Sequence, residues 1–160
     1  MRVEFIDPFV RAGFSALEML IQDHPKRGDL SLREAKFTTQ QVTIMTGVNG
    51  DIEGTILLGM SLPTAQGIAS TMIGFPIEEM DDMAWSAISE LGNIITGNAV
   101  QLLYDAGFKC DITPPSVLLG TDTQISTQVP ALVVPVSTRL GNLEINVALR
   151  ETSLKSVRAA

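Results

Sequence analysis

The sequence predicts an α+β fold: an antiparallel β-sheet of about six strands on which two long helices and one shorter helix pack. The patterns run in the order helix, three strands, two helices, three strands. Short turn-forming segments such as Asn49-Gly50-Asp51 join neighbouring strands, which indicates hairpins and therefore antiparallel pairing. Capping residues and glycines bound the helices, which fixes where each begins and ends.

The first half of the chain begins with a helix. Asp7 and Pro8 predict its start, as an N-cap acceptor followed by proline at the first helical position. Apolar residues recur at helical spacing as far as Ile21, and Asp23-His24-Pro25 ends the helix. After a polar loop through Gly28, alternating or β-branched patterns predict strands at about residues 32–37, 41–48 and 54–60.

The second half begins with two helices. Leu62-Pro63-Thr64 starts the shorter one, which ends at Gly74. Asp81-Asp82 caps a long helix that runs to about Asp105, and these acids also favour the helix dipole. The remaining strands are predicted at about residues 109–119, 131–136 and 143–149, and the last ten residues as a frayed tail or short helix.

Length and composition favour one domain over residues 1–160. The chain is 45% hydrophobic and 18% charged, so it can bury a sizeable core and is too apolar to be disordered. A net charge of −7 without a basic cluster argues against nucleic-acid binding. No apolar run approaches the ~20 residues of a membrane span, and the start does not resemble a signal peptide. We therefore expect a cytoplasmic protein with neither a nucleic-acid nor a membrane partner.

Few residues outside the long helix could carry chemistry. His24 and Cys110 are the only histidine and the only cysteine, which is too few for the usual zinc site or a disulfide. No phosphate-binding loop with its lysine is present. Asp81 and Asp82 already have the ordinary role of a helix cap. Hydrolytic chemistry would therefore need a metal that the partner or substrate supplies.

The long helix separates into two stripes at spacings of three and four residues. The apolar stripe is expected to pack on the sheet and consists of Ala84, Ile88, Leu91, Ile95, Ala99 and Leu102. The other stripe is small and polar and consists of Ser86, Glu90, Asn93, Gly97 and Gln101. Asparagine is a poor helix former, and Gly92 and Gly97 each cost about 1 kcal/mol relative to alanine. Helix stability therefore does not explain these choices.

The polar stripe could serve hydrolysis on another protein. An asparagine amide both donates and accepts hydrogen bonds, so Asn93 could hold a water in line with a phosphoryl group. Glu90 would pair with a lysine at the partner's site, and Gly97 leaves a bare patch for close approach. The alternative is an ordinary solvated helix face whose glycines serve packing, and spacing alone favours it because a lone E-x-x-N is a weak motif.

The residues around this stripe closely resemble the signature of the CheC/CheX/FliY phosphatases. Ser86, Glu90 and Asn93 match it, and Pro114-Pro115 fall near the family's downstream proline, about one residue off. Gly97-Asn98-Ala99 follows the motif and belongs to the same match. Further similarity to the CheX type lies in Asp7-Pro8-Phe9, residues 47–54 and Met72-Ile73-Gly74, so that essentially the whole chain is covered.

This resemblance implies hydrolysis of the aspartyl phosphate of a CheY-like response regulator. It implies that Asn93 positions the attacking water and that Glu90 contacts the regulator's active-site lysine. We expect the rest of the polar stripe, Ser86, Gly97 and Gln101, to contact this partner. The resemblance also implies no cofactor of the protein's own, with Mg2+ held by the regulator, and a homodimer joined through a sheet edge, where free N–H and C=O groups can pair.

Two alternatives stay open beside this reading. The same helix face could belong to a non-catalytic module that binds a regulator or a flagellar or signalling assembly, although retention of both Glu90 and Asn93 weighs against it. A small-molecule binder has little support, because convergent polar core residues are missing. Residues 11–18 contain no second E-x-x-N, which favours the one-site CheX type over the two-site CheC type.

Overall fold

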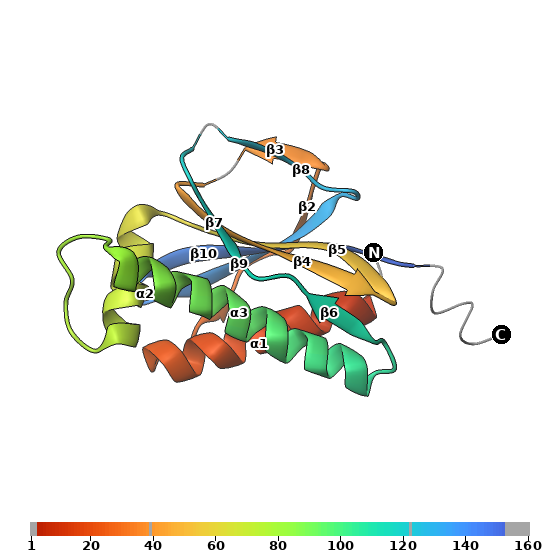
Figure 1. Cartoon of the computed structure of the whole chain (residues 1–160), viewed down its shortest axis with the longest axis horizontal. Coiled ribbons are helices and arrows are strands. Elements are labelled where there is room, and N and C mark those ends of the chain that lie inside the picture. The colour runs from red at the N-terminus through yellow and green to blue at the C-terminus, as the bar shows by residue number, and fades with distance from the viewer. Residues whose placement is uncertain (1–2, 39, 122, 153–160) are drawn as a thin grey trace.

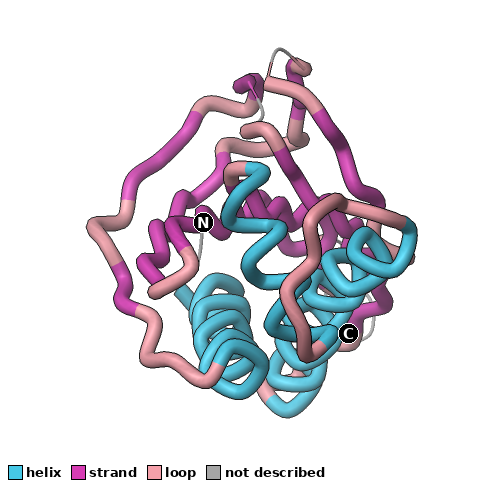
Figure 2. The backbone as a smooth tube through the Cα atoms, turned by 90° about the vertical axis from the view of Figure 1, so that its left-hand side faces the viewer, coloured by secondary structure: helices cyan, strands magenta, loops and turns pink. Residues whose placement is uncertain are grey.

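The computed structural model describes residues 3–38, 40–121 and 123–152. An eight-stranded antiparallel sheet carries three helices on one face, and a two-stranded sheet lies over the other face (Figure 1). Figure 2 shows the helices gathered on one side of the strands. The α+β prediction is therefore confirmed. Among the described residues, no helix is both long enough and apolar enough to cross a membrane.

The helices are α1 (Val3–Ile21), α2 (Leu62–Ile73) and α3 (Asp82–Asp105). The strands are β1 (Lys26–Arg27), β2 (Ser31–Arg33), β3 (Lys36–Thr38), β4 (Val42–Gly50), β5 (Ile52–Met60), β6 (Cys110–Ile112), β7 (Ser116–Leu119), β8 (Gln124–Ser126), β9 (Ala131–Thr138) and β10 (Gly141–Glu151). The large sheet has the order β1-β9-β10-β5-β4-β6, with β2 also on β9 and β7 also on β4, whereas β3 pairs with β8.

The core lies between the helices and the large sheet. Alternate residues of the central strands point into it, as the period of two in a strand requires. On β4, for example, Val42, Ile44 and Val48 are almost fully buried. Burying one such side chain stabilises the fold by about 1.5–3 kcal/mol, so this interface holds α3 firmly against β4.

The predicted bounds of α2 and the predicted cap of α3 are confirmed. The Ser61 side chain accepts a hydrogen bond from Thr64 N at the start of α2, and Gly74 ends this helix at φ 102°, a left-handed conformation that favours glycine. Asp81 Oδ1 accepts a hydrogen bond from Ala84 N at 2.9 Å, which fixes the first turn of α3. The helix that carries the polar stripe therefore begins at a defined residue.

The predicted start of the first helix is wrong. Helix α1 begins at Val3, and Pro8 lies inside it, where it costs a backbone hydrogen bond. The extra turn brings Phe5 into the core beside Phe9, and the Phe5 ring packs edge-on against Phe108 with centroids 5.2 Å apart. Burial of this aromatic side chain offsets the cost of the proline. Asp7 is therefore no cap and instead pairs with Arg11 at 3.4 Å.

Several strand predictions also need correction. Predicted strand 32–37 is divided between β2 and β3, which belong to different sheets, and predicted strand 109–119 is divided between β6 and β7. Strands β1 and β8 were not predicted, because two or three residues are too few to show a period. At the C-terminus Glu151 still belongs to β10 and Thr152 follows it, whereas residues 153–160 of the predicted tail lie outside the described residues.

Candidate functional site

Helix α3 turns its two stripes in the predicted directions. The apolar stripe is buried from Ala84 to Ala99, but it ends in Leu103 rather than the predicted Leu102, which is only half-buried. Helix α3 packs on α1 and α2 as well as on the sheet, so its buried surface is wider than the predicted stripe and also includes Gly92 and Thr96. The stripe is held down by this packing, and the opposite face is left to solvent.

A groove of about 850 Å³ runs between the exposed face of α3 and the segment that joins β6 to β7. Three residues of the predicted polar stripe line it, namely Ser86, Glu90 and Asn93, which lie on successive turns of the helix. Pro114 and Pro115 line the facing wall, together with Thr113 and neighbouring strand residues. Residues from two distant parts of the sequence therefore meet in one groove.

A β-bulge shapes the facing wall. Met45 on β4 pairs with Ser116, and Val48 pairs with Ile112. These positions are three residues apart on β4 but four apart on the partner segment, which therefore carries one extra residue. Thr113 holds the break to β4: its N–H donates to Gly47 O at 3.0 Å, and its hydroxyl accepts from Gly47 N at 2.8 Å. The prolines that follow have no N–H for the ladder and line the groove instead.

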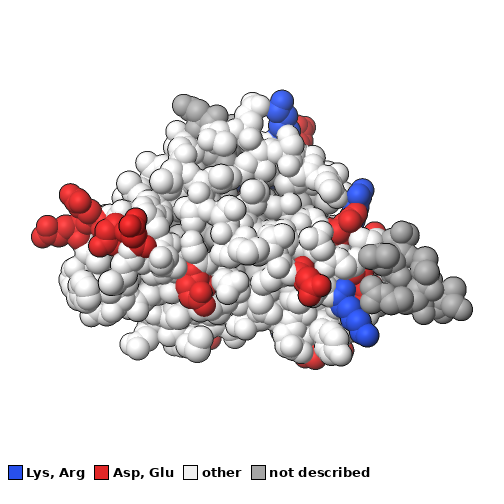
Figure 3. Space-filling view, viewed as in Figure 1, with Lys and Arg blue, Asp and Glu red and all other residues white. Residues whose placement is uncertain are grey.

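The groove carries acidic groups and no basic ones. Among its lining residues, Asp82 and Glu90 are the charged ones, and none is lysine, arginine or histidine. Figure 3 shows the face that carries α3, with acidic side chains gathered at the end where the loop between α2 and α3 lies. Within the described part of the chain, the side chains of Glu90 and Asn93 make no hydrogen bond or ion pair. These two groups are therefore available to another molecule.

The two glycines of the motif region lie in different environments. A Cβ on Gly92 would meet Ile44 Cγ2 at 2.5 Å, so this glycine allows α3 to pack closely on β4. A Cβ on Gly97 would meet nothing within 4 Å, apart from the helix's own backbone and chain neighbours. Packing therefore explains Gly92, as the ordinary reading of the helix allowed, but it does not explain Gly97.

The remaining predicted contact residues lie outside the groove. Gly97 is one turn beyond Asn93 and does not line the groove. Gln101 faces a separate hollow of about 290 Å³ between α1 and α3, and its amide donates to Asp105 Oδ1 at 3.2 Å. The structure thus groups Ser86 with Glu90 and Asn93, and the partner contacts of Gly97 and Gln101 stay predictions.

Sequence reasoning missed other residues of the groove. Ser89 lies four positions before Asn93, and the same helical spacing could have identified it. Trp85 lines both this groove and a neighbouring one of about 560 Å³ that also includes Leu62 and Leu119. Only the tertiary structure brings Leu119 to that place, so no spacing in the sequence indicates it.

Neither a metal cluster nor a reactive thiol accompanies the groove in the part of the chain that the structure describes. No group of three or more histidine, cysteine, aspartate or glutamate residues could hold a metal ion there. Burial raises the pKa of the Cys110 thiol, which keeps it neutral and a poor nucleophile at neutral pH. The candidate chemistry therefore depends on Glu90 and Asn93.

Comparison with known proteins shows the family of the chain. The family model described as chemotaxis phosphatase CheX matches residues 42–137, which include the whole of α3 and the β-bulge. The CheY-P phosphatase CheX of Thermotoga maritima is 29% identical over 138 residues, which are 86% of this chain and 89% of that protein.

Solved structures share the fold over nearly the whole chain. The CheX–CheY–BeF3–Mg2+ complex from Borrelia burgdorferi contains a chain that is 30% identical, with a TM-score of 0.76 over 94% of this chain and 100% of that one. A CheC-like superfamily protein from Shewanella sp. PV-4 is 25% identical, with a TM-score of 0.82 over 94% of this chain and 99% of that one.

Proposed function

The chain belongs to the CheX family of chemotaxis phosphatases, and we propose that it hydrolyses the aspartyl phosphate of a CheY-like response regulator. The observation that carries this proposal is the groove in which Glu90 and Asn93 lie together with no partners among the described residues. The names of two relatives support it, since one is a CheY-P phosphatase and another is solved in complex with CheY.

Asn93 supplies the positioning step. Its carboxamide accepts a hydrogen bond from a water and can donate another to the phosphoryl group, which places the water oxygen in line with phosphorus. Attack of the water oxygen forms the new P–O bond as the bond to the regulator's aspartate breaks. The aspartate leaves as a carboxylate, and the protons of the water leave with the inorganic phosphate or pass to solvent. This service needs an exposed amide that the fold itself does not use, and Asn93 meets that requirement.

Glu90 fixes the approach of the regulator. It lies three residues before Asn93 on the same exposed face, so a lysine that it binds would be held close to the attacking water. A charge-assisted hydrogen bond to a lysine ammonium is stronger than a neutral one and sets the docking angle. Ser86, one turn before Glu90, contacts the regulator at the same groove, and Gly97 and Gln101 extend the contact along the helix.

The positive charge for phosphoryl transfer comes from the partner. Developing charge on the phosphoryl oxygens has to be stabilised by cations, and the groove contains carboxylates but no basic residue. We therefore assign the Mg2+ and the lysine to the regulator, and the water-positioning amide to this protein. An acidic groove on its own would repel free phosphate, so the substrate is a phosphoprotein whose site already holds cations.

We also propose that two copies of the chain join through a sheet edge. Strands β6 and β7 form one edge of the large sheet, and β3 with β8 presents short edges of its own. Such edges offer unpaired backbone groups that a second copy can pair with. Light scattering on the purified protein should give twice the monomer mass, and a monomer at micromolar concentration would contradict this part of the proposal.

The decisive test follows phosphate loss from phosphorylated CheY-like regulators with and without this protein. Wild type should shorten the lifetime of the phosphate, and Asn93→Ala should return it to the regulator's own rate. An unchanged rate in Asn93→Ala would overturn the catalytic role. Wild type that binds a phosphorylated regulator without changing the lifetime would establish a non-catalytic binding module instead.

A further inference from the structure

Gly92 lies where the working helix touches the sheet. Gly92 lies between Glu90 and Asn93 in the sequence and is buried. A Cβ at this position would point towards β4, away from the exposed face that carries those two side chains. A Cβ at this position would be 2.5 Å from Ile44 Cγ2 and 3.6 Å from Ile44 Cβ. Non-bonded carbon atoms approach to about 3.5–4.0 Å, so the shorter distance leaves no room for a methyl group.

Ile44 cannot easily move out of the way. Its Cγ2 is attached directly to Cβ, so only rotation about χ1 or a shift of the backbone displaces it. Ile44 is 1% exposed and sits on a central strand that is paired on both sides. Any side chain on Gly92 would therefore lift or roll α3 rather than push Ile44 aside.

Pro115, in the facing wall of the groove, also lies close to Gly92. The Cβ that Gly92 lacks would lie 3.8 Å from Pro115 Cβ, on the bulge between β6 and β7. A side chain at position 92 would thus meet both Ile44, on the sheet beneath α3, and Pro115, in the far wall of the groove. The two residues on the open face of this turn, Glu90 and Asn93, are carried by the same segment of helix.

On this geometry, and resting on the proposed function, we propose that Gly92 is a positioning residue that sets the height of Asn93 and Glu90 relative to the Pro115 wall. It contacts neither substrate nor water. By letting α3 rest directly on Ile44, it fixes how far the carboxamide reaches into the regulator's site. A lifted helix would still dock on the regulator but would hold the water out of line.

The experiment compares two buried helix glycines that face isoleucines. Gly92→Ala is the test, and Gly13→Ala in α1 is the control, because a Cβ there would meet Ile145 Cδ1 at 2.6 Å. Both changes crowd the core and improve helix propensity, but only the first lies under the groove. Because Cδ1 is the flexible end of its side chain, Gly13→Ala should be relieved by a rotation.

The measurements are kcat and KM for phosphate loss from a radiolabelled regulator. Gly92→Ala should lower kcat on the order of 10-fold or more, because small misplacements of a positioning group are costly, while KM stays within about threefold. Gly13→Ala should keep the wild-type kcat. Adding Ile44→Leu, which has no second carbon on Cβ, should restore most of the kcat of Gly92→Ala, as expected for contacting residues.

The outcomes separate this inference from the proposed function. If Asn93→Ala loses activity but Gly92→Ala keeps the wild-type kcat, the positioning role is wrong and the proposed function stands. If wild type leaves the phosphate lifetime unchanged, both are wrong. Equal losses in Gly13→Ala and Gly92→Ala would make the effect one of general packing and overturn the inference. If Gly92→Ala does not fold, the double variant Gly92→Ala/Ile44→Leu takes its place. A double variant that is also unfolded, or folded but inactive, would overturn the positioning role.

Discussion

Two regions of this molecule, on opposite faces of the sheet, each contain a glutamate and an asparagine side by side. On β10, Glu144 and Asn146 are two residues apart, which places them on the same face of a strand. On α3, Glu90 and Asn93 are three apart, which places them on the same face of a helix. The residue types are identical, and their surroundings differ completely.

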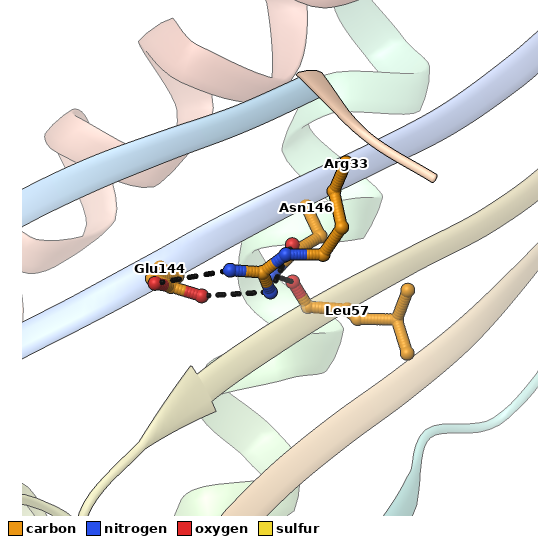
Figure 4. A network of polar contacts seen from close by, with 4 residues as sticks. All are labelled: Arg33, Leu57, Glu144 and Asn146. Carbon is orange, nitrogen blue, oxygen red and sulfur yellow. Dashed lines mark hydrogen bonds and ion pairs between the residues drawn. The ribbon is translucent and has the colours of Figure 1, made fainter. Parts of the chain in front are cut away.

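The pair on β10 is fully engaged. Arg33 Nη1 donates to Glu144 Oε2 at 3.0 Å and to Asn146 Oδ1 at 3.2 Å, and Asn146 Nδ2 donates to Leu57 O at 3.4 Å (Figure 4). Asn146 is 2% exposed, so these bonds replace the water it has lost. The Arg33 guanidinium also lies 5.0 Å from the centroid of the Phe37 ring, which ties β3 to this network.

The pair on α3 is exposed and has no partner among the described residues. Polar groups that the fold needs are hydrogen-bonded within it, and leaving them open in the interior would cost free energy. Polar groups that stay open beside a groove cost the fold nothing and can serve another molecule. The difference between the two pairs therefore separates residues that hold the structure from residues that carry the proposed function.

Among substitutions of charged residues in these two regions, the largest effect should come from Glu90→Gln. Loss of the carboxylate would remove the charged hydrogen bond that we propose Glu90 makes to the regulator's lysine, so the phosphatase rate should fall on the order of 10- to 100-fold. The free energy of unfolding should stay within about 0.5 kcal/mol of wild type. Rate assays and urea unfolding measure both quantities. The matched control is Glu18→Gln on α1, outside the groove, and an equal loss of rate there would contradict the assignment.

Arg33→Ala should have the converse effect. It leaves Glu144 and Asn146 without their donor in a region where the Arg33 and Glu144 side chains are 30% and 25% exposed. The free energy of unfolding should fall by about 2 kcal/mol, while the phosphatase rate is unchanged. Arg11→Ala, which breaks an ion pair between side chains 64% and 53% exposed, should cost less than about 1 kcal/mol. Equal costs for the two variants would refute the distinction.

The smallest effect should come from Asp23, an exposed carboxylate that is nevertheless engaged. Hydrogen bonds from the backbone N–H of Arg139 and then of His24 lower its pKa below the ordinary 3.8. Its contribution to stability is therefore complete above that value and is lost as the pH falls through the lowered pKa. Asp23→Asn should unfold at a slightly lower temperature than wild type at pH 7, and the difference should vanish in strong acid. A difference that grew on acidification would contradict this reading.

Much of the site could be predicted from sequence because helical spacing is a local property. Ser86, Glu90 and Asn93 fall on one exposed face through the 3.6-residue period alone, and the cap at Asp81 fixes where the helix begins. The hairpin of β4 and β5 follows from the turn at residues 49–51. Long, strongly patterned elements carry their structure within their own segment.

The rest depends on contacts between distant segments. Pro114 and Pro115 indicate a break within residues 109–119, but the bulge at Thr113 is set by its pairing with Gly47, which those residues alone do not show. Burial of Phe5 against Phe108 extends α1 through Pro8, against the local preference of the sequence. The partners of Glu144 and Asn146 come from Arg33, more than a hundred residues away. Sequence therefore cannot distinguish the engaged pair from the open one.

The most direct test measures stability and phosphatase rate together for Asn93→Ala and Arg33→Ala. Asn93→Ala should remove the acceleration of phosphate loss and leave the free energy of unfolding within about 0.5 kcal/mol of wild type. Arg33→Ala should lower the free energy of unfolding and leave the rate per folded molecule unchanged. If Asn93→Ala keeps the wild-type rate, or loses it only in proportion to lost stability, Asn93 does not position the attacking water.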